Sequence, residues 1–209
     1  MIEQLICNGI VNVEDIDQLA HACEALNARL IFIDVSFVLP NSGIDIYQNF
    51  KEAHIPDALL MDITKICDTD CDLPHMLPSS DIFGQKISEL GIRNSDVLVL
   101  YGQQGMIVGP ARGWWMLKGF GHNRVVVLNG GLPEWIKQGK PTQTGQIEHR
   151  MVTSYNAAPF NADMVCDMQN VIDASDKANP VIIDARPADR FNGNLPEPRE
   201  NMRSGHIQA

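Results

Sequence analysis

The side chains best suited to chemistry lie near the C-terminal end of this sequence, in the stretch RFNGNLPEPRENMRSGHIQA. Arg190 and Arg199 stand on either side of a proline-containing loop in that stretch. Because a guanidinium group binds a carboxylate or a similar oxoanion through two parallel hydrogen bonds, two such arginines could form a fork for a small anion. Their spacing also fits two solvated loop arginines, so spacing alone leaves both interpretations open.

The other candidate reactive groups are five cysteines and a histidine in LPHMLP. Cys67 and Cys71 stand near His75, but two cysteines and one histidine without a matched fourth ligand predict no metal site. His75 is either a partly buried histidine bonded to the backbone or an accessory proton carrier. An odd number of cysteines argues against a disulfide framework and favours reduced thiols in the cytoplasm.

Charge and composition exclude several classes of partner. The net charge of −10 opposes binding to nucleic acid, although a local basic site for a small anion remains compatible with it. No apolar run is long enough to span a membrane, and the N-terminus has no targeting pattern, so we expect a cytoplasmic protein without membrane contact. The glycines at 102, 105 and 109 do not match a dinucleotide or phosphate-loop motif, and we predict no cofactor.

Strands alternate with helices along the chain, which predicts an α/β fold with a parallel sheet covered on both faces. Ser80 is the expected N-cap of a helix that ends at Gly91, and Asn12 of an earlier helix. The apolar runs that predict buried strands are Leu30–Val38, Asp96–Tyr101, Arg124–Leu128 and Val181–Asp184.

Two segments share one plan, LIFIDVSFVLP…FKEAHIPDA and PVIIDARPADRF…RSGHIQA. In each, an apolar strand ends in an aspartate and His-Ile follows further along, so Asp34 corresponds to Asp184 and His54 to His206. The first copy continues through further helices and strands that the second lacks. We therefore predict a complete domain over residues 1–145, a linker over 146–160 and a partial second copy over 161–209.

These residues resemble the tandem rhodanese family, which includes thiosulfate and 3-mercaptopyruvate sulfurtransferases. The resemblance covers most of the chain and rests on four stretches: AHIPDALLMDI, DLPHMLPSSDIFGQKISELGI, GPARGWWMLKGFGHNRVVVLNGGLPEWIKQGKP and VIIDARPADRFNGNLPEPRENMRSGHI. It implies a rhodanese-like parallel sheet with helices on both faces, complete in the first domain and truncated within the second.

The resemblance also implies a chemistry, in which a cysteine thiolate takes a sulfane sulfur and passes the persulfide sulfur to a thiol or cyanide. In the family this cysteine lies in the loop after a central strand. In this chain the matching loop holds no cysteine, so the first domain is expected to be non-catalytic; its residues are Gly102, Gln103, Gln104, Gly105 and Met106. By the same analogy, the nucleophile of the second copy would lie beyond Ala209, and these 209 residues alone would be inactive.

The resemblance gives Arg190 and Arg199 the carboxylate of the sulfur donor as a ligand, and makes His75 an accessory group near the active site. Relatives of the mercaptopyruvate type often carry an acidic residue where this chain has Thr64, so an acid–histidine relay is not expected. Two alternatives stay open. The chain could be a non-catalytic rhodanese-fold module that binds a partner or senses an anion, or the incomplete second copy could drive self-association.

Overall fold

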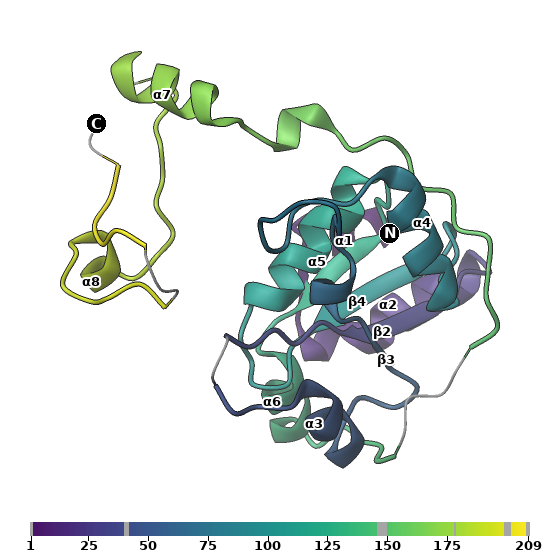
Figure 1. The fold of residues 1–209 in the computed structure, drawn as a ribbon. Coiled ribbons are helices and arrows are strands. Elements are labelled where there is room, and N and C mark those ends of the chain that lie inside the picture. The colour runs from purple at the N-terminus through teal and green to yellow at the C-terminus, as the bar shows by residue number, and fades with distance from the viewer. Residues whose placement is uncertain (1, 40–41, 146–149, 178, 199–201, 208–209) are drawn as a thin grey trace. The chain divides into compact units, whose positions relative to one another are not determined.

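The computed structural model describes residues 2–39, 42–145, 150–177, 179–198 and 202–207 (Figure 1). The chain forms two compact units. The first comprises Met1–Val38 and Gly43–Asn161, and the second Leu39–Ser42 and Ala162–Ala209. No described helix is long and apolar enough to cross a membrane.

The first unit is built on a five-stranded sheet in which every strand pair is parallel, as predicted. Its spatial order is β1-β5-β4-β2-β3, and β4 lies at the centre with all its residues buried. Strands buried on both faces are typically continuous apolar runs, which is why VLVLY was readable in the sequence. The strands are β1 (Ile10–Val11), β2 (Leu30–Asp34), β3 (Leu59–Leu60), β4 (Val97–Tyr101) and β5 (Val125–Leu128).

Helices cover both faces of this sheet (Figure 1). Alternate residues of β4 enter two separate cores, Val99 on one face and Leu98 on the other. The Val99 face packs against α1 (Ile2–Ile6), α2 (Ile16–Ala25), α3 (Ile46–Glu52) and α6 (Gly131–Lys137). The Leu98 face packs against α4 (Ser80–Glu89) and α5 (Val108–Gly119). Short 3-10 turns are η1 (Val13–Asp15) and η2 (Ile63–Lys65).

Three predicted boundaries differ from the structure. Ser79 caps α4 by accepting from the N–H of Ile82 at 3.3 Å, so the predicted cap at Ser80 was one residue late. Asn12 precedes η1 and makes no side-chain capping bond. The strand predicted to reach Val38 ends at Asp34, because Asp34 already lies opposite the last residue of β4 and no ladder partner follows.

Residues 150–160, part of the segment predicted to be a linker, belong to the first unit. The N–H of Thr153 donates to the carbonyl of Ser88 at 3.1 Å, and that of Ala158 to the carbonyl of Phe120 at 3.0 Å. Tyr155 is buried in the core beside α4 and α5. Residues 146–149 lie outside the described part of the chain.

The second unit contains η3 (Ala162–Met164), α7 (Met168–Lys177) and α8 (Ala188–Phe191). The predicted strand Val181–Asp184 was wrong, since these residues form no regular secondary structure and belong to no sheet. A strand needs a neighbour to satisfy its N–H and C=O groups, and the described residues of this unit include no other strand. Val181 and Ile183 are accordingly 81% and 85% exposed.

Candidate functional site

The 102–107 loop lies where the sheet changes its direction of winding. From β2 the chain moves outward to β3, and from β4 it moves the opposite way to β5. The connections that leave neighbouring β2 and β4 therefore diverge, which leaves a crevice at the carboxyl ends of these strands where α/β proteins bind ligands. Four of the five residues predicted to form an inactive loop line this crevice: Gly102, Gln103, Gln104 and Met106.

The crevice itself is almost closed. The N–H of Gln103 donates to Oγ of Ser36 at 2.9 Å, and the carbonyl of Gly102 accepts from the N–H of Leu132 at 3.1 Å. A Cβ at position 102 would lie 2.6 Å from the carbonyl oxygen of Met106, so this tight turn requires glycine. The cleft between Ser36, Asn49 and the loop leaves ≈ 10 Å³, about the space of one water molecule. It offers neither a thiol nor room for a substrate.

Asp34 is fully buried at the end of β2, beside this loop. Its Oδ1 accepts from the N–H of Ser36 at 2.9 Å. Burial raises the pKa of this carboxyl to about 6, against a lowering contribution from its hydrogen bonds to Ser36. When this buried carboxyl is ionised at neutral pH, it lowers the free energy of unfolding of the protein.

Asp34→Asn is expected to stabilise the protein in a pH-dependent way. Because burial raises the pKa of Asp34, protonated Asp34 contributes fully to the free energy of unfolding below the ordinary aspartate pKa of about 3.9. This contribution is lost as the pH rises through about 6. Asparagine mimics the protonated carboxyl and can still accept from Ser36. Urea unfolding should give nearly equal stabilities at about pH 4 and a gain of about 3 kcal/mol for the variant above pH 7. A difference that stays constant across this range would contradict the assignment, and exposed Asp70→Asn serves as the control.

The backbone of His75 is fixed by a contact with a side chain of α5. Its φ of 61° is left-handed, and its carbonyl accepts from Nη2 of Arg112 at 2.8 Å. The ring of His75 lies edge-on to Phe37 at 5.6 Å. Thr64, the residue that argued against an acid–histidine relay, donates its hydroxyl to Asp62 at 2.6 Å. The accessory role of His75 stays a prediction.

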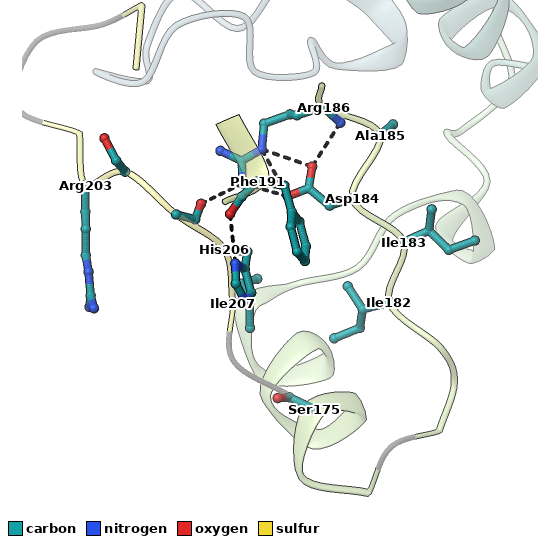
Figure 2. Close-up of a pocket in the computed structure, with 12 residues that line it drawn as sticks. Ser175, Ile182, Ile183, Asp184, Ala185, Arg186, Phe191, Arg203, His206 and Ile207 are labelled. Atoms are coloured by element: carbon teal, nitrogen blue, oxygen red, sulfur yellow. Dashed lines mark hydrogen bonds and ion pairs between the residues drawn. The ribbon is translucent and has the colours of Figure 1, made fainter. Parts of the chain in front are cut away.

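In the second unit, one buried carboxylate joins two arginines. Glu197 is only 2% exposed in its side chain; its Oε1 accepts from Nη1 of Arg186 at 2.8 Å, and its Oε2 pairs with Nη2 of Arg190. Arg186 also donates from Nε and Nη2 to Asp184, as Figure 2 shows. The pKa of Asp184 is lowered to about 2, chiefly by hydrogen bonds from Arg186, and the pKa of Glu197 is lowered chiefly by Arg190. Both carboxyl groups are therefore charged at neutral pH.

The fork predicted from Arg190 and Arg199 is described only in part. Arg199 lies outside the described residues. Nε of Arg190 is buried and has no hydrogen-bond partner among the described residues, whereas its Nη2 is fixed by Glu197. The role of Glu197 was not predicted; the only signal in the sequence is an acidic residue between two prolines, two positions before Arg199.

The two sequence copies share local contacts. The ring of His54 stacks on Phe50 with a centroid distance of 4.0 Å, and its Nδ1 lies 2.7 Å from the carbonyl oxygen of Phe50. His206 stacks on Phe191 at the same distance and angle, with Nδ1 2.8 Å from the Phe191 carbonyl oxygen.

The residues after the paired aspartates also match. Oδ1 of Asp184 accepts from the N–H two residues on, at Arg186, as Oδ1 of Asp34 does from Ser36. The first copy therefore has a serine where the second has the arginine that binds Glu197.

A cavity of ≈ 840 Å³ lies within the second unit (Figure 2). Its lining is mostly apolar, with Ile182, Phe191 and Ile207 beside Arg203 and His206. Arg190 is not part of this lining.

The five cysteines are all unpaired, and none follows a central strand. Cys23 is buried in α2, where desolvation raises the pKa of its thiol, so it is a poor nucleophile. Cys7 and Cys166 are exposed, and Cys67 and Cys71 are partly exposed. Within the described ranges, no three His, Cys, Asp or Glu side chains are gathered as a metal site would require.

Comparisons with known proteins agree on one family. The Rhodanese-like domain model matches residues 15–138. The thiosulfate/3-mercaptopyruvate sulfurtransferase 1 of Arabidopsis thaliana is 35% identical over 197 residues, covering 85% of this chain and 52% of that protein. The 3-mercaptopyruvate sulfurtransferase of Escherichia coli K12 is 38% identical over 163 residues, covering 78% of this chain and 57% of that protein.

The crystal structure of Escherichia coli SseA, described as a 3-mercaptopyruvate sulfotransferase, matches with a TM-score of 0.78 at 32% identity. The match covers 95% of this chain and 72% of that one. The chain thus spans little more than half the length of the two curated relatives above.

Proposed function

We propose, since this chain belongs to the rhodanese family, that it is part of a sulfurtransferase whose nucleophilic cysteine lies outside these 209 residues. The thiolate would take a sulfane sulfur from thiosulfate or 3-mercaptopyruvate and become a persulfide. A thiol or cyanide would then accept that sulfur. The relatives named above are sulfurtransferases, which supports the reaction class.

The observation that carries the proposal is the loop after β4. A reactive thiolate needs a lowered pKa, which backbone N–H groups and a helix N-terminus supply in such a loop. The 102–107 loop precedes α5, a helix of 12 residues, but holds glutamine and methionine instead of cysteine. The first unit thus has the scaffold of a sulfur-transfer site without its reactive atom.

The matching contacts of His54 and His206 support the proposal that the second unit begins a second copy of this scaffold. In that copy Arg186 and Arg190 are paired with Asp184 and Glu197, so these four side chains carry no net charge and the charge for a substrate anion would come from Arg199. Glu197 holds the Arg190 guanidinium in one orientation, and the buried Nε of Arg190 would have to be uncovered before it could donate to a substrate carboxylate. Arg199 would complete the fork.

The proposal is tested by reading the complete gene and assaying its product. We expect the coding sequence to continue past Ala209 and to place a cysteine in a loop after a second central strand. The encoded protein should convert 3-mercaptopyruvate, and Arg190→Lys should raise KM about tenfold with a smaller effect on kcat, since lysine lacks the planar fork.

The 209-residue chain by itself should give no thiocyanate from thiosulfate and cyanide, and no pyruvate from 3-mercaptopyruvate and a thiol. Robust turnover by this polypeptide would contradict our placement of the nucleophile. A gene that ends at Ala209 and encodes an inactive protein would instead favour the second candidate function, a non-catalytic binding module. The thiol-free loop supports that candidate. The cleft of ≈ 10 Å³ beside Ser36 is too small for a ligand, whereas a hollow of ≈ 220 Å³ lined by Gly105 and Ile107 of the same loop has space for a small one.

A further inference from the structure

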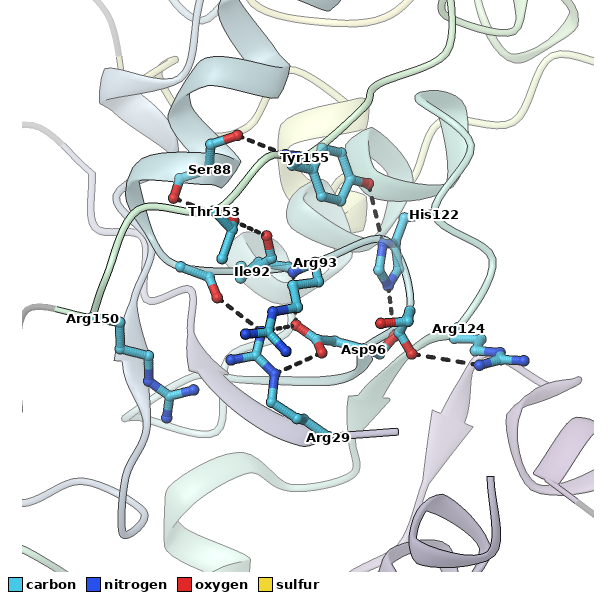
Figure 3. A network of polar contacts seen from close by, with 12 residues as sticks. Arg29, Ser88, Ile92, Arg93, Asp96, His122, Arg124, Arg150, Thr153 and Tyr155 are labelled. Carbon is cyan, nitrogen blue, oxygen red and sulfur yellow. Dashed lines mark hydrogen bonds and ion pairs between the residues drawn. The ribbon is translucent and has the colours of Figure 1, made fainter. Parts of the chain in front are cut away.

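A groove lined by three arginines opens at the opposite edge of the sheet from the 102–107 loop, where β2 and β4 begin (Figure 3). Arg29 immediately precedes β2, Arg93 lies in the turn before β4, and Arg150 comes from the segment that packs on the first unit. The groove has a volume of ≈ 810 Å³, and its lining includes no aspartate or glutamate. In a chain with 26 acidic and 16 basic residues, it is unexpected that every charged residue of this lining is an arginine.

One acidic group, Asp96, lies beneath the groove, and both of its carboxylate oxygens already accept hydrogen bonds. Asp96 is buried, with a side chain 1% exposed. It accepts from Nε and Nη2 of Arg29 at 2.8 and 2.5 Å, and from the N–H of Arg93 at 2.7 Å. Asp96 therefore offsets the charge of Arg29 alone.

The charges of the other two arginines are not compensated by an ion pair among the described residues. Arg150 donates from Nη2 to the backbone carbonyl of Asp57 at 2.8 Å, and the guanidinium of Arg93 is exposed. Arg124, just before β5, donates to the carbonyl of Ser95 at 3.4 Å and adds a further cation nearby. The groove thus has an excess of positive charge together with the hydroxyls of Ser95 and Ser154.

The walls of the groove are fixed by a buried polar network, which Figure 3 shows. Nε2 of His122 lies 3.1 Å from the carbonyl oxygen of Asp96, and its Nδ1 lies 3.1 Å from the hydroxyl of Tyr155. The hydroxyl of Thr153 donates to the carbonyl of Ile92. Burial lowers the pKa of His122 to about 4, so this histidine is neutral at physiological pH and serves to hold the backbone. A ligand would meet a site that needs little ordering.

We propose that this groove binds a small, multiply charged oxoanion of the phosphate class. Guanidinium groups bind phosphate oxygens through paired N–H donors, and three of them in one groove match several anionic groups better than a single one. The volume lies within the range of small-molecule sites, about 300–1,000 Å³. The strongly acidic chain opposes a nucleic acid as the ligand. This inference does not depend on the sulfur-transfer proposal.

The test uses inorganic triphosphate and the chain as it is. Calorimetry at about 50 mM salt should show one site, and Arg93→Ala or Arg150→Ala should each weaken binding about tenfold or more. Lys51→Ala removes the same charge from an exposed position of α3 that is not part of the groove lining, and should change the affinity less than about twofold. Arg29 is left intact because its loss would strand the buried carboxylate of Asp96.

Circular dichroism establishes that each variant is folded, and amide spectra locate the site. Triphosphate should shift the signals of residues 93–96 and 150–154. The proposal is overturned if no binding appears up to about 1 mM triphosphate. It is equally overturned if Lys51→Ala weakens binding as much as Arg93→Ala, or if sulfate at matched ionic strength gives the same shifts. Either result would mean that the groove only adds to a general cationic attraction.

Discussion

Arg29→Met is expected to lower the free energy of unfolding by about 3–5 kcal/mol, the cost of breaking a buried ion pair from one side. Arg29 is 34% exposed, whereas its partner Asp96 is 1% exposed and receives two of its hydrogen bonds from this guanidinium. Methionine preserves most of the packing of the arginine stem. The variant therefore leaves Asp96 buried with the N–H of Arg93 as its remaining charge-stabilising donor. Urea unfolding monitored by circular dichroism measures the loss.

Two further variants show whether the buried charge causes this loss. The double variant Arg29→Met with Asp96→Asn should recover part of the stability, because a neutral amide costs less to bury than an unpaired carboxylate. Lys137→Met removes an exposed lysine that pairs with Glu134 at 2.9 Å and should cost less than about 1 kcal/mol. If the single and double variants at Arg29 were equally unstable, lost packing would explain the effect instead.

The sequence predicted the centre of the sheet well and its edges poorly. β4 and β5 each begin one residue after the predicted start and end where predicted, because both are continuous apolar runs buried on two faces. β1 and β3 have two residues each and could not be recognised, since so short a segment has no periodicity. The opposite error occurred at Val181–Asp184, where a strand was predicted and none forms. An apolar run predicts burial, but a strand also requires a neighbouring strand to pair with.

The candidate site was predictable in residue type and not in contacts. The absence of a cysteine from the 102–107 loop is visible in the amino-acid sequence itself. The role of Glu197 was not, because the path of the 191–198 loop decides which arginines its carboxylate reaches. The arginine groove was missed for the same reason. Arg29, Arg93 and Arg150 are far apart in sequence, and only the register of β2 beside β4 and the packing of residues 150–154 bring them together.

Gly109→Ala is the substitution expected to damage the first unit most. Gly109 lies in the first turn of α5, and a Cβ there would lie 1.8 Å from the carbonyl oxygen of Val35, just after β2. The Cβ position is fixed by the backbone of α5 and the Val35 oxygen is a backbone atom, so no side-chain rotation can relieve the contact. The helix would have to move away from β2, and Leu117 and Phe120 of the buried core would move with it. We expect a loss above about 4 kcal/mol, or failure to fold.

Gly113 provides the matched control, one turn along the same helix. A Cβ at position 113 would lie 3.1 Å from Cγ1 of Val35 and 3.3 Å from Cδ1 of Leu100, both ends of side chains that can shift. Alanine also gains up to about 1 kcal/mol over glycine within a helix, so Gly113→Ala should stay within about 1 kcal/mol of the parent protein. Soluble yield and urea unfolding distinguish the two variants. Equal stability of both would mean that α5 can retreat from β2 at little cost, and that the close approach at Val35 does not fix the position of the 102–107 loop.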